Sequence, residues 1–147
     1  MATFARHADV EWIGNLMEGK GTAKAGTGAF TVPVTFPSRI APVGDDKTTP
    51  EELLAAAHAV CYTMVLTNTI TKQGGKARNV RVTATVTGDK SDAGLKVVSS
   101  HLKATVEGLE GIEKAALGEL ATAAEKGCPM SNAIRGNVAI TVEAQAV

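Results

Sequence analysis

The sequence predicts an α+β fold in which strand segments surround two helices. Three observations lead to this fold class. Short β-prone pieces separated by glycines fill the first third of the chain, a long apolar helix begins abruptly near residue 49, and two alternating segments joined by a turn follow that helix. At 147 residues, of which 44% are hydrophobic, the chain is long enough to bury a core, and a single domain over residues 1–147 is expected.

The first third, residues 8–36, is predicted to form a small antiparallel meander. Its β-prone pieces alternate with glycine-rich turns and cover residues 10–13, 21–25 and 30–34. The glycines of GKGTAKAGTG precede another strand rather than a helix, so they lack the helix N-terminus that a phosphate-binding loop needs. No bound cofactor is expected.

A loop and an abrupt helix start follow the meander. Residues 37–47 contain two prolines, a glycine and two aspartates, which predicts a loop that carries Arg39. Thr49 can then serve as a helix N-cap, with a proline at the first helical position and Glu52 placed for a capping box. This capping arrangement gives no structural role to Glu51.

The central helix is apolar on nearly every face. Over residues 53–66 the only clearly polar side chains are His58, Tyr62 and Thr63, so the helix should be buried on most sides. It is predicted to run to about Lys72 and to end at the two glycines that follow shortly after. Its apolar surface exceeds what one small domain easily covers, which indicates that a partner chain covers part of it.

Strand signals return after the central helix. Residues 80–88 and 95–108 alternate with period two and are joined by the turn-forming residues 89–94, so they predict a long hairpin. A last strand is predicted at residues 137–142.

The second helix lies between the hairpin and the last strand. Residues 111–126 place Ile112, Leu120 and the interleaved alanines on one stripe, which predicts an amphipathic helix ended by Gly127. A short helical turn in CPMSNAIRG follows it.

The charge balance limits the classes of partner. Fifteen Lys and Arg against fifteen Asp and Glu give no net charge, so the composition does not favour nucleic acid or an anionic membrane surface as a partner. The N-terminal residues hold no apolar run typical of a signal peptide, and no later stretch is an unbroken apolar segment of about twenty residues. A cytoplasmic protein is expected, whose ligand is small or neutral or is another protein.

The two cysteines are candidate reactive thiols, because they are too few for a disulfide framework and lack paired metal-site spacing. Cys61 lies in the apolar helix, where burial raises a thiol pKa, so a catalytic role would need a nearby cation; otherwise it is a small core residue. Cys128 precedes Pro129 and is expected at a helix N-terminus, where the dipole favours a thiolate, or it is a packed turn residue. The spacing of the two cysteines in the sequence does not show whether they lie close together in space.

The histidines leave two readings open. His58 lies three residues before Cys61 on one helix face, so it could activate the thiol or be a core histidine bonded to a backbone carbonyl. His7 and His101 lie in strand-like contexts far apart in sequence. A metal site built from these residues would have no recognisable spacing, so no metal is expected.

Two motifs resemble those of a known family. The segment TTPEELLAAAHAVCYTMVL, residues 48–66, is similar to the reactive-cysteine signature of the OsmC/Ohr family, and KGCPMSNAIRG, residues 126–136, is similar to its second-cysteine motif. The two occur in the family's order and distance. The segment EWIGNLMEGKGTAKAGTGAF near the N-terminus, together with His58 in the first motif, resembles the OsmC branch in particular.

This resemblance implies an intertwined homodimer whose active sites lie at the subunit interface. Cys61 matches the peroxidatic cysteine and Cys128 the resolving one. Glu51 matches the glutamate that holds an arginine against the thiolate, and Arg39 matches that arginine. A guanidinium fixed by a carboxylate could both stabilise a thiolate and donate to peroxide oxygens.

The implied activity is reduction of alkyl or lipid hydroperoxides, and more weakly of hydrogen peroxide, in oxidative and osmotic stress defence. Cys61 would become a sulfenic acid and then form a disulfide with Cys128, which a dithiol reductant would reset. Lipoyl-bearing proteins supply this reductant in the Ohr branch. The alternative is a non-enzymatic dimer of the same fold that binds a ligand or serves a structural role under stress, with two inert core cysteines.

Overall fold

The computed structural model describes residues 3–147, and its elements follow the predicted α+β order. The chain divides into two compact units at the junction of Leu53 and Leu54. A meander and a short helix belong to the first unit, and a hairpin, two further helices and a last strand belong to the second.

The first unit contains the predicted antiparallel meander. Its strands are β1 (Ala8–Ile13), β2 (Lys20–Ala25) and β3 (Thr31–Val34), which pair in the order β1-β2-β3. Ala23 is the buried apolar residue of these strands, whereas Val10 and Ile13 are 67% and 63% exposed. The sheet therefore carries apolar side chains that it does not itself cover.

Arg39 lies on a short helix rather than in the predicted loop. Helix α1 (Phe36–Ile40) begins at Thr35, whose side chain accepts a hydrogen bond from the backbone N–H of Ser38, and Pro37 lies in its first turn. A threonine N-cap followed by an early proline is a helix-start signal. The loop prediction was wrong for residues 37–40, because Pro37 lies in the first turn of a helix, and the loop is confined to the residues after Ile40.

Helix α2 (Pro50–Lys72) begins and ends as predicted. The backbone N–H of Glu52 donates to the hydroxyl of Thr49, which confirms Thr49 as the N-cap. The predicted capping box is wrong, because the Glu52 carboxylate accepts a hydrogen bond from the hydroxyl of Thr48 and not from the backbone N–H of Thr49. At the other end Gly74 has a φ of +81°. The N–H groups of Gly74 and Gly75 donate to carbonyls of the last turn, a Schellman ending.

The second unit contains a three-stranded sheet in the order β4-β5-β6. Strands β4 (Asn79–Ser91) and β5 (Gly94–Glu107) form the predicted hairpin, but they continue through most of the predicted turn and leave only Asp92 and Ala93 between them. Cross-strand pairing overrides the local turn preference of these polar residues. Strand β6 (Ala139–Ala146) pairs parallel to β5 and lies farther along the chain than the predicted 137–142.

The second predicted helix begins later than its sequence pattern suggested. A 3₁₀ turn, η1 (Lys114–Ala116), precedes α3 (Leu117–Gly127), and the short helix α4 (Pro129–Ile134) follows directly. The 3₁₀ turn shifts the phase of the helix, so Leu117, Ala121 and Ala124 are buried while Leu120 is only half-buried.

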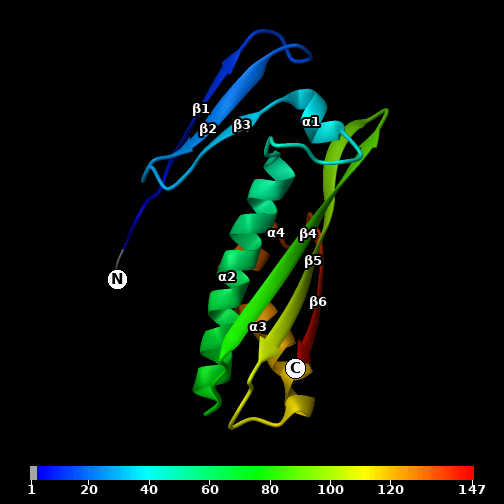
Figure 1. The fold of residues 1–147 in the computed structure, drawn as a ribbon. Coiled ribbons are helices and arrows are strands. Elements are labelled where there is room, and N and C mark those ends of the chain that lie inside the picture. Colours follow the sequence, from blue (N-terminus) through cyan, green and yellow to red (C-terminus); the bar gives the residue numbers. More distant parts are fainter. Residues whose placement is uncertain (1–2) are drawn as a thin grey trace. The chain divides into compact units, whose positions relative to one another are not determined.

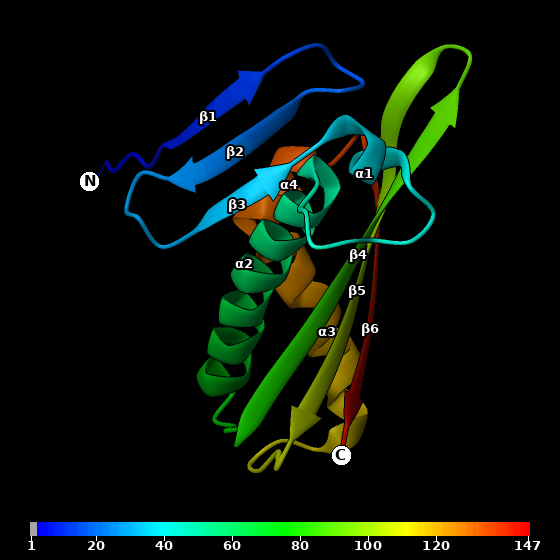
Figure 2. The ribbon, with the colours of Figure 1, turned by 45° about the horizontal axis from the view of Figure 1, so that its top comes forward.

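The core of the second unit lies between one face of the sheet and the two longer helices (Figure 1 and Figure 2). Apolar side chains from α2, β5 and α3 meet there: Tyr62, Leu66, Ile70, Leu102, Ala104, Val106, Leu117, Ala121 and Ala124. Burying each of the larger ones contributes about 1.5–3 kcal/mol. Helix α2 is long and apolar enough, by length and composition, to cross a membrane, but its inward side chains make it the core helix of this unit.

Candidate active site

The structure brings the two cysteines together, which their spacing alone could not show. Cys61 lies on α2 and is half-buried, and Cys128 is fully buried at the junction of α3 and α4, where it is the N-cap of α4. Cys61 packs against the core cluster that contains Cys128, and its pKa is affected both by the Cys128 thiol and by the backbone N–H of Met130. Both cysteines are free thiols. The predicted helix start at Pro129 is confirmed.

The second unit by itself does not make Cys61 a good nucleophile. Burial raises the pKa of Cys61, the N–H of Met130 lowers it, and the neighbouring Cys128 raises it, so the pKa lies above its ordinary value. A thiolate at neutral pH therefore needs a further positive charge beside the sulfur.

His58 is a core histidine, not the partner of Cys61. It is 0% exposed, and its ring nitrogens bond to two serine hydroxyls, Nδ1 to Ser100 at 2.7 Å and Nε2 to Ser131 at 2.8 Å. Burial lowers the pKa of His58 below the ordinary 6.5, and the Glu125 carboxylate acts in the opposite direction. The imidazole is thus held neutral, and serines take the place of the backbone carbonyl that the sequence suggested.

Arg39 and Glu51 form the ion pair that the family resemblance implied. Arg39 Nε lies 3.1 and 3.2 Å from the two carboxylate oxygens of Glu51, and Nη2 lies 2.7 Å from Oε1. Burial alone would raise the pKa of Glu51, but hydrogen bonds led by that from Arg39 outweigh it and leave the pKa lowered. The carboxylate is therefore ionised at neutral pH and fixes the guanidinium.

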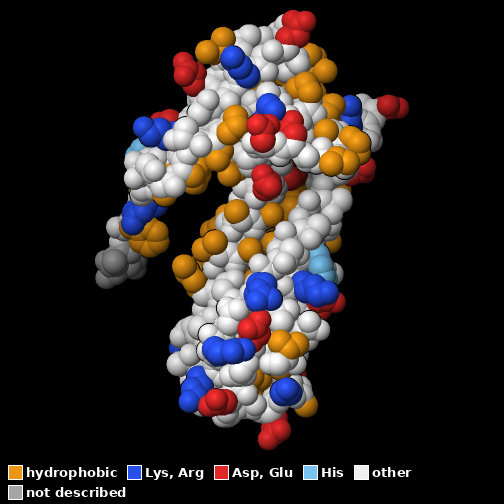
Figure 3. Space-filling view, in the orientation of Figure 1, with side chains coloured by type: hydrophobic (Ala, Val, Ile, Leu, Met, Phe, Trp, Pro, Cys, Tyr) orange, Lys and Arg blue, Asp and Glu red, His pale blue; other side chains and the backbone are white. Residues whose placement is uncertain are grey.

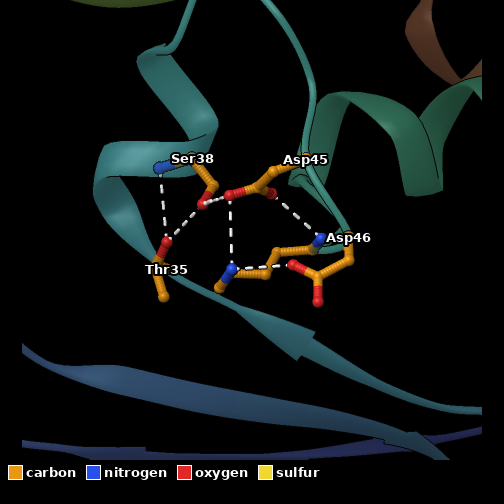
Figure 4. Close-up of polar contacts among 5 residues, drawn as sticks. Thr35, Ser38, Asp45 and Asp46 are labelled. Carbon is orange, nitrogen blue, oxygen red and sulfur yellow. Dashed lines mark hydrogen bonds and ion pairs between the residues drawn. The ribbon is translucent and has the colours of Figure 1, made fainter.

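A second set of contacts fixes the helix that carries Arg39 (Figure 4). Ser38 donates to Oδ2 of Asp45 at 2.8 Å, and the other oxygen of Asp45 accepts from the backbone N–H of Lys47 at 3.0 Å. The Lys47 ammonium also reaches Asp45 and Asp46. The segment between α1 and α2 is thereby folded back on α1, which keeps Arg39 within reach of Glu51.

An apolar cavity of about 260 Å³ lies beside Arg39 in the first unit. Its walls are mainly aliphatic and aromatic and come from Val10, Trp12, Leu16, Ala23, Val34, Phe36, Pro50 and Leu53. The Arg39 side chain, 30% exposed, supplies the charged group of this lining. Such a cavity suits a ligand with a hydrocarbon body and one polar group.

Several polar groups near the thiols were not singled out in the sequence. Ser131 lies inside the CPMSNAIRG motif, and Ser100 has the same inward register on β5 as Leu102, so alternation could have placed it toward the core. Arg135 bonds to Glu125 at 2.6 Å across the α3–α4 junction. Within residues 3–147 no group of three or more His, Cys, Asp or Glu side chains is arranged to hold a metal ion.

The chain is similar in sequence to a known protein family over most of its length. A sequence model of the OsmC-like protein family matches residues 43–143. Peroxiredoxin OsmC of Escherichia coli is 31% identical over 139 residues, which cover 94% of this chain and 95% of that protein. An organic hydroperoxide resistance protein of Xanthomonas axonopodis pv. citri is 29% identical and covers 84% of both chains. The chain belongs to the OsmC-like family.

Solved structures show the same fold over the whole chain. An organic hydroperoxide resistance protein from Elizabethkingia anophelis superposes with a TM-score of 0.78 at 25% identity and covers 100% of both chains. One from Legionella pneumophila superposes with a TM-score of 0.77 at 24% identity and covers 99% of both. The predicted fold class and family are confirmed.

The buried histidine makes stability depend on pH in a defined direction. Because the pKa of His58 is lowered on folding, the unfolded chain takes up the proton first, and stability falls as the pH drops below 6.5. We expect His58→Gln to lose less stability than the parent, by up to about 1 kcal/mol, between pH 6.5 and about pH 5.5. Urea unfolding at both pH values and one protein concentration measures this, and equal losses in the two proteins would contradict it.

Proposed function

We propose that this protein is a thiol-dependent peroxidase that reduces organic hydroperoxides to alcohols in oxidative stress defence. The observation that carries the proposal is the proximity of Cys61 and Cys128 in the core of the second unit. Both cysteines lie within residues 43–143, which match the family model, and in segments that resemble the family's two cysteine motifs. The names of the OsmC and organic hydroperoxide resistance relatives support the reaction class.

The chemistry follows from the two thiols. The Cys61 thiolate attacks one peroxide oxygen, the O–O bond breaks, and the alkoxide leaves and takes a proton to become an alcohol. Cys61 is then a sulfenic acid. The Cys128 sulfur displaces its hydroxyl as water and closes a disulfide, and a dithiol reductant, of which a lipoyl-bearing protein is one candidate, restores both thiols by exchange.

Arg39 is the cation that we propose for Cys61. The second unit leaves the pKa of this thiol raised, so a guanidinium is needed to favour the thiolate. Arg39 is held by Glu51 through both carboxylate oxygens and keeps Nη1 for other acceptors such as a peroxide oxygen. In the working enzyme that we propose, the Arg39–Glu51 ion pair lies beside the Cys61 thiol.

The substrate class follows from the cavity beside Arg39. Its lining is apolar, so it favours an alkyl or lipid chain over hydrogen peroxide, which has no apolar surface to bury.

The working form that we propose is a cytoplasmic, intertwined homodimer of single-domain chains with active sites at the subunit interface. Apolar side chains gather over the middle of α2 (Figure 3), where Val60 and Met64 are 56% and 67% exposed. The meander also exposes Val10 and Ile13. Apolar surfaces of this kind on a soluble chain mark an interface, and a second copy is the partner that closed symmetry favours.

The two cysteines should have unequal roles. Cys61→Ser should abolish hydroperoxide consumption even in a first turnover, because a serine hydroxyl is not ionised near neutral pH. Cys128→Ser should still consume about one equivalent, leave a sulfenic acid that a dimedone-type reagent traps, and overoxidise with excess peroxide. Intact mass and free-thiol counts measure both. Parental activity in both variants would favour inert core cysteines and a non-enzymatic dimer.

The two glutamates at the start of α2 should separate activity from stability. Glu51→Ala should lower the peroxidase rate roughly ten- to hundredfold, the rate equivalent of a charged hydrogen bond worth ~1.5–3 kcal/mol, with little loss of stability. Glu52→Ala should leave the rate near the parental value and destabilise by about 1 kcal/mol through its lost bond to Thr48. Single-turnover kinetics and urea unfolding give the two values; equal loss of rate in both would mean the wrong glutamate was chosen.

The homodimer is tested by light scattering at micromolar concentration. We expect twice the mass of one 15.1 kDa chain. A monomer that keeps its native circular dichroism would contradict the proposed interface.

A further inference from the structure

His58 is buried close to the thiols, but the peroxidase chemistry described above does not use it. We propose that His58 is a positioning residue for disulfide closure: by bonding Ser131 it holds the first turn of α4, and with it Cys128, against Cys61. The inference rests on the proposed function, since it concerns the second step of that reaction.

Two parallel contacts join α2 to the start of α4. On α2, His58 and Cys61 are three residues apart and share a face. At α4, Cys128 is the N-cap and Ser131 lies three residues later. His58 pairs with Ser131, and Cys61 pairs with Cys128, so the two pairs lie next to each other between α2 and the start of α4.

Two further polar contacts hold α4 to α3. The N–H of Cys128 donates to the Glu125 carbonyl at 3.1 Å, and Arg135 bonds to the Glu125 carboxylate at 2.6 Å. Two contacts link α4 to α2 among the described residues: the backbone N–H of Met130 faces the Cys61 sulfur, and the side chains of His58 and Ser131 share a hydrogen bond of 2.8 Å. His58 and Ser131 are both 0% exposed, so water cannot take the place of either partner without opening the core.

This contact matters when Cys61 has been oxidised. The sulfenic acid either loses water to the Cys128 thiol, forming the disulfide, or reacts with a second hydroperoxide and becomes a sulfinic acid. The first route requires the Cys128 sulfur to lie in line with the S–O bond, and a displacement of about 1 Å can slow such a step up to roughly a hundredfold. Fixing α4 therefore favours closure over overoxidation.

The two serine partners of His58 offer a matched comparison. Ser131→Ala and Ser100→Ala each remove one hydroxyl that is 0% exposed and bonded to the same ring, but only Ser131 belongs to α4. We expect Ser131→Ala to slow disulfide closure about tenfold and to raise the dimedone-trapped fraction, whereas Ser100→Ala stays within about twofold of the parent. Formation of the sulfenic acid in the first turnover with cumene hydroperoxide should be unchanged in Ser100→Ala and should slow less than disulfide closure does in Ser131→Ala.

A second pair of variants covers the case in which a serine variant does not fold. The amide of Gln stands as many bonds from Cβ as Nε2 of His58, and that of Asn as many as Nδ1, so His58→Gln can keep the bond to Ser131 and His58→Asn the bond to Ser100. His58→Gln should close the disulfide faster than His58→Asn, with circular dichroism confirming that both are folded.

Diamide oxidises a dithiol without a hydroperoxide, so it tests the role of His58 in disulfide closure independently of the proposed peroxidase function. Slow closure of Ser131→Ala and of His58→Asn with both oxidants supports the inference. Equal closure rates within each pair of variants would overturn it and leave the proposed function intact. A parent protein that consumes no hydroperoxide would overturn the proposed function, while the diamide comparison would still decide the role of His58.

Discussion

The packing of α2 against β5 and α3 is the constraint on which the second unit depends. Tyr62, Leu66 and Ile70 fill the space between the sheet and α3, and the Tyr62 hydroxyl donates to the Ala121 carbonyl at 3.0 Å. This packing fixes the rotation of α2 about its axis. It therefore determines that Cys61 and His58 face the α3–α4 junction rather than solvent.

The same burial makes Cys61 harder to ionise. A thiol on a core helix is protected and well placed, but burial raises its pKa and weakens it as a nucleophile. The chain carries a guanidinium whose orientation is already fixed by a carboxylate and by the fold of α1, so little entropy is lost when it binds an anion. The proposed function requires this cation to lie beside the buried thiol, which is the environment expected of a reactive cysteine.

Polar side chains in the second unit hold α4 to the neighbouring elements. His58 bonds one serine on β5 and one on α4, and Glu125 pairs with Arg135 across the junction that contains Cys128. Buried polar contacts of this kind specify one arrangement among several of similar apolar packing. Cys128 caps a helix of only six residues, and so short a helix has little packing surface of its own to fix its position.

The sequence by itself determined the features that depend on neighbouring residues. The start of α2 at Thr49, its end before Gly74 and the helix start at Cys128 were all readable, because caps and left-handed glycines act within a few positions. Only the tertiary structure decided the length of the hairpin, the phase of α3 and the contacts of the thiols. The partners of His58 lie 42 and 73 positions away, and Arg39 lies 12 from Glu51, so these contacts exist only once packing has brought distant segments together.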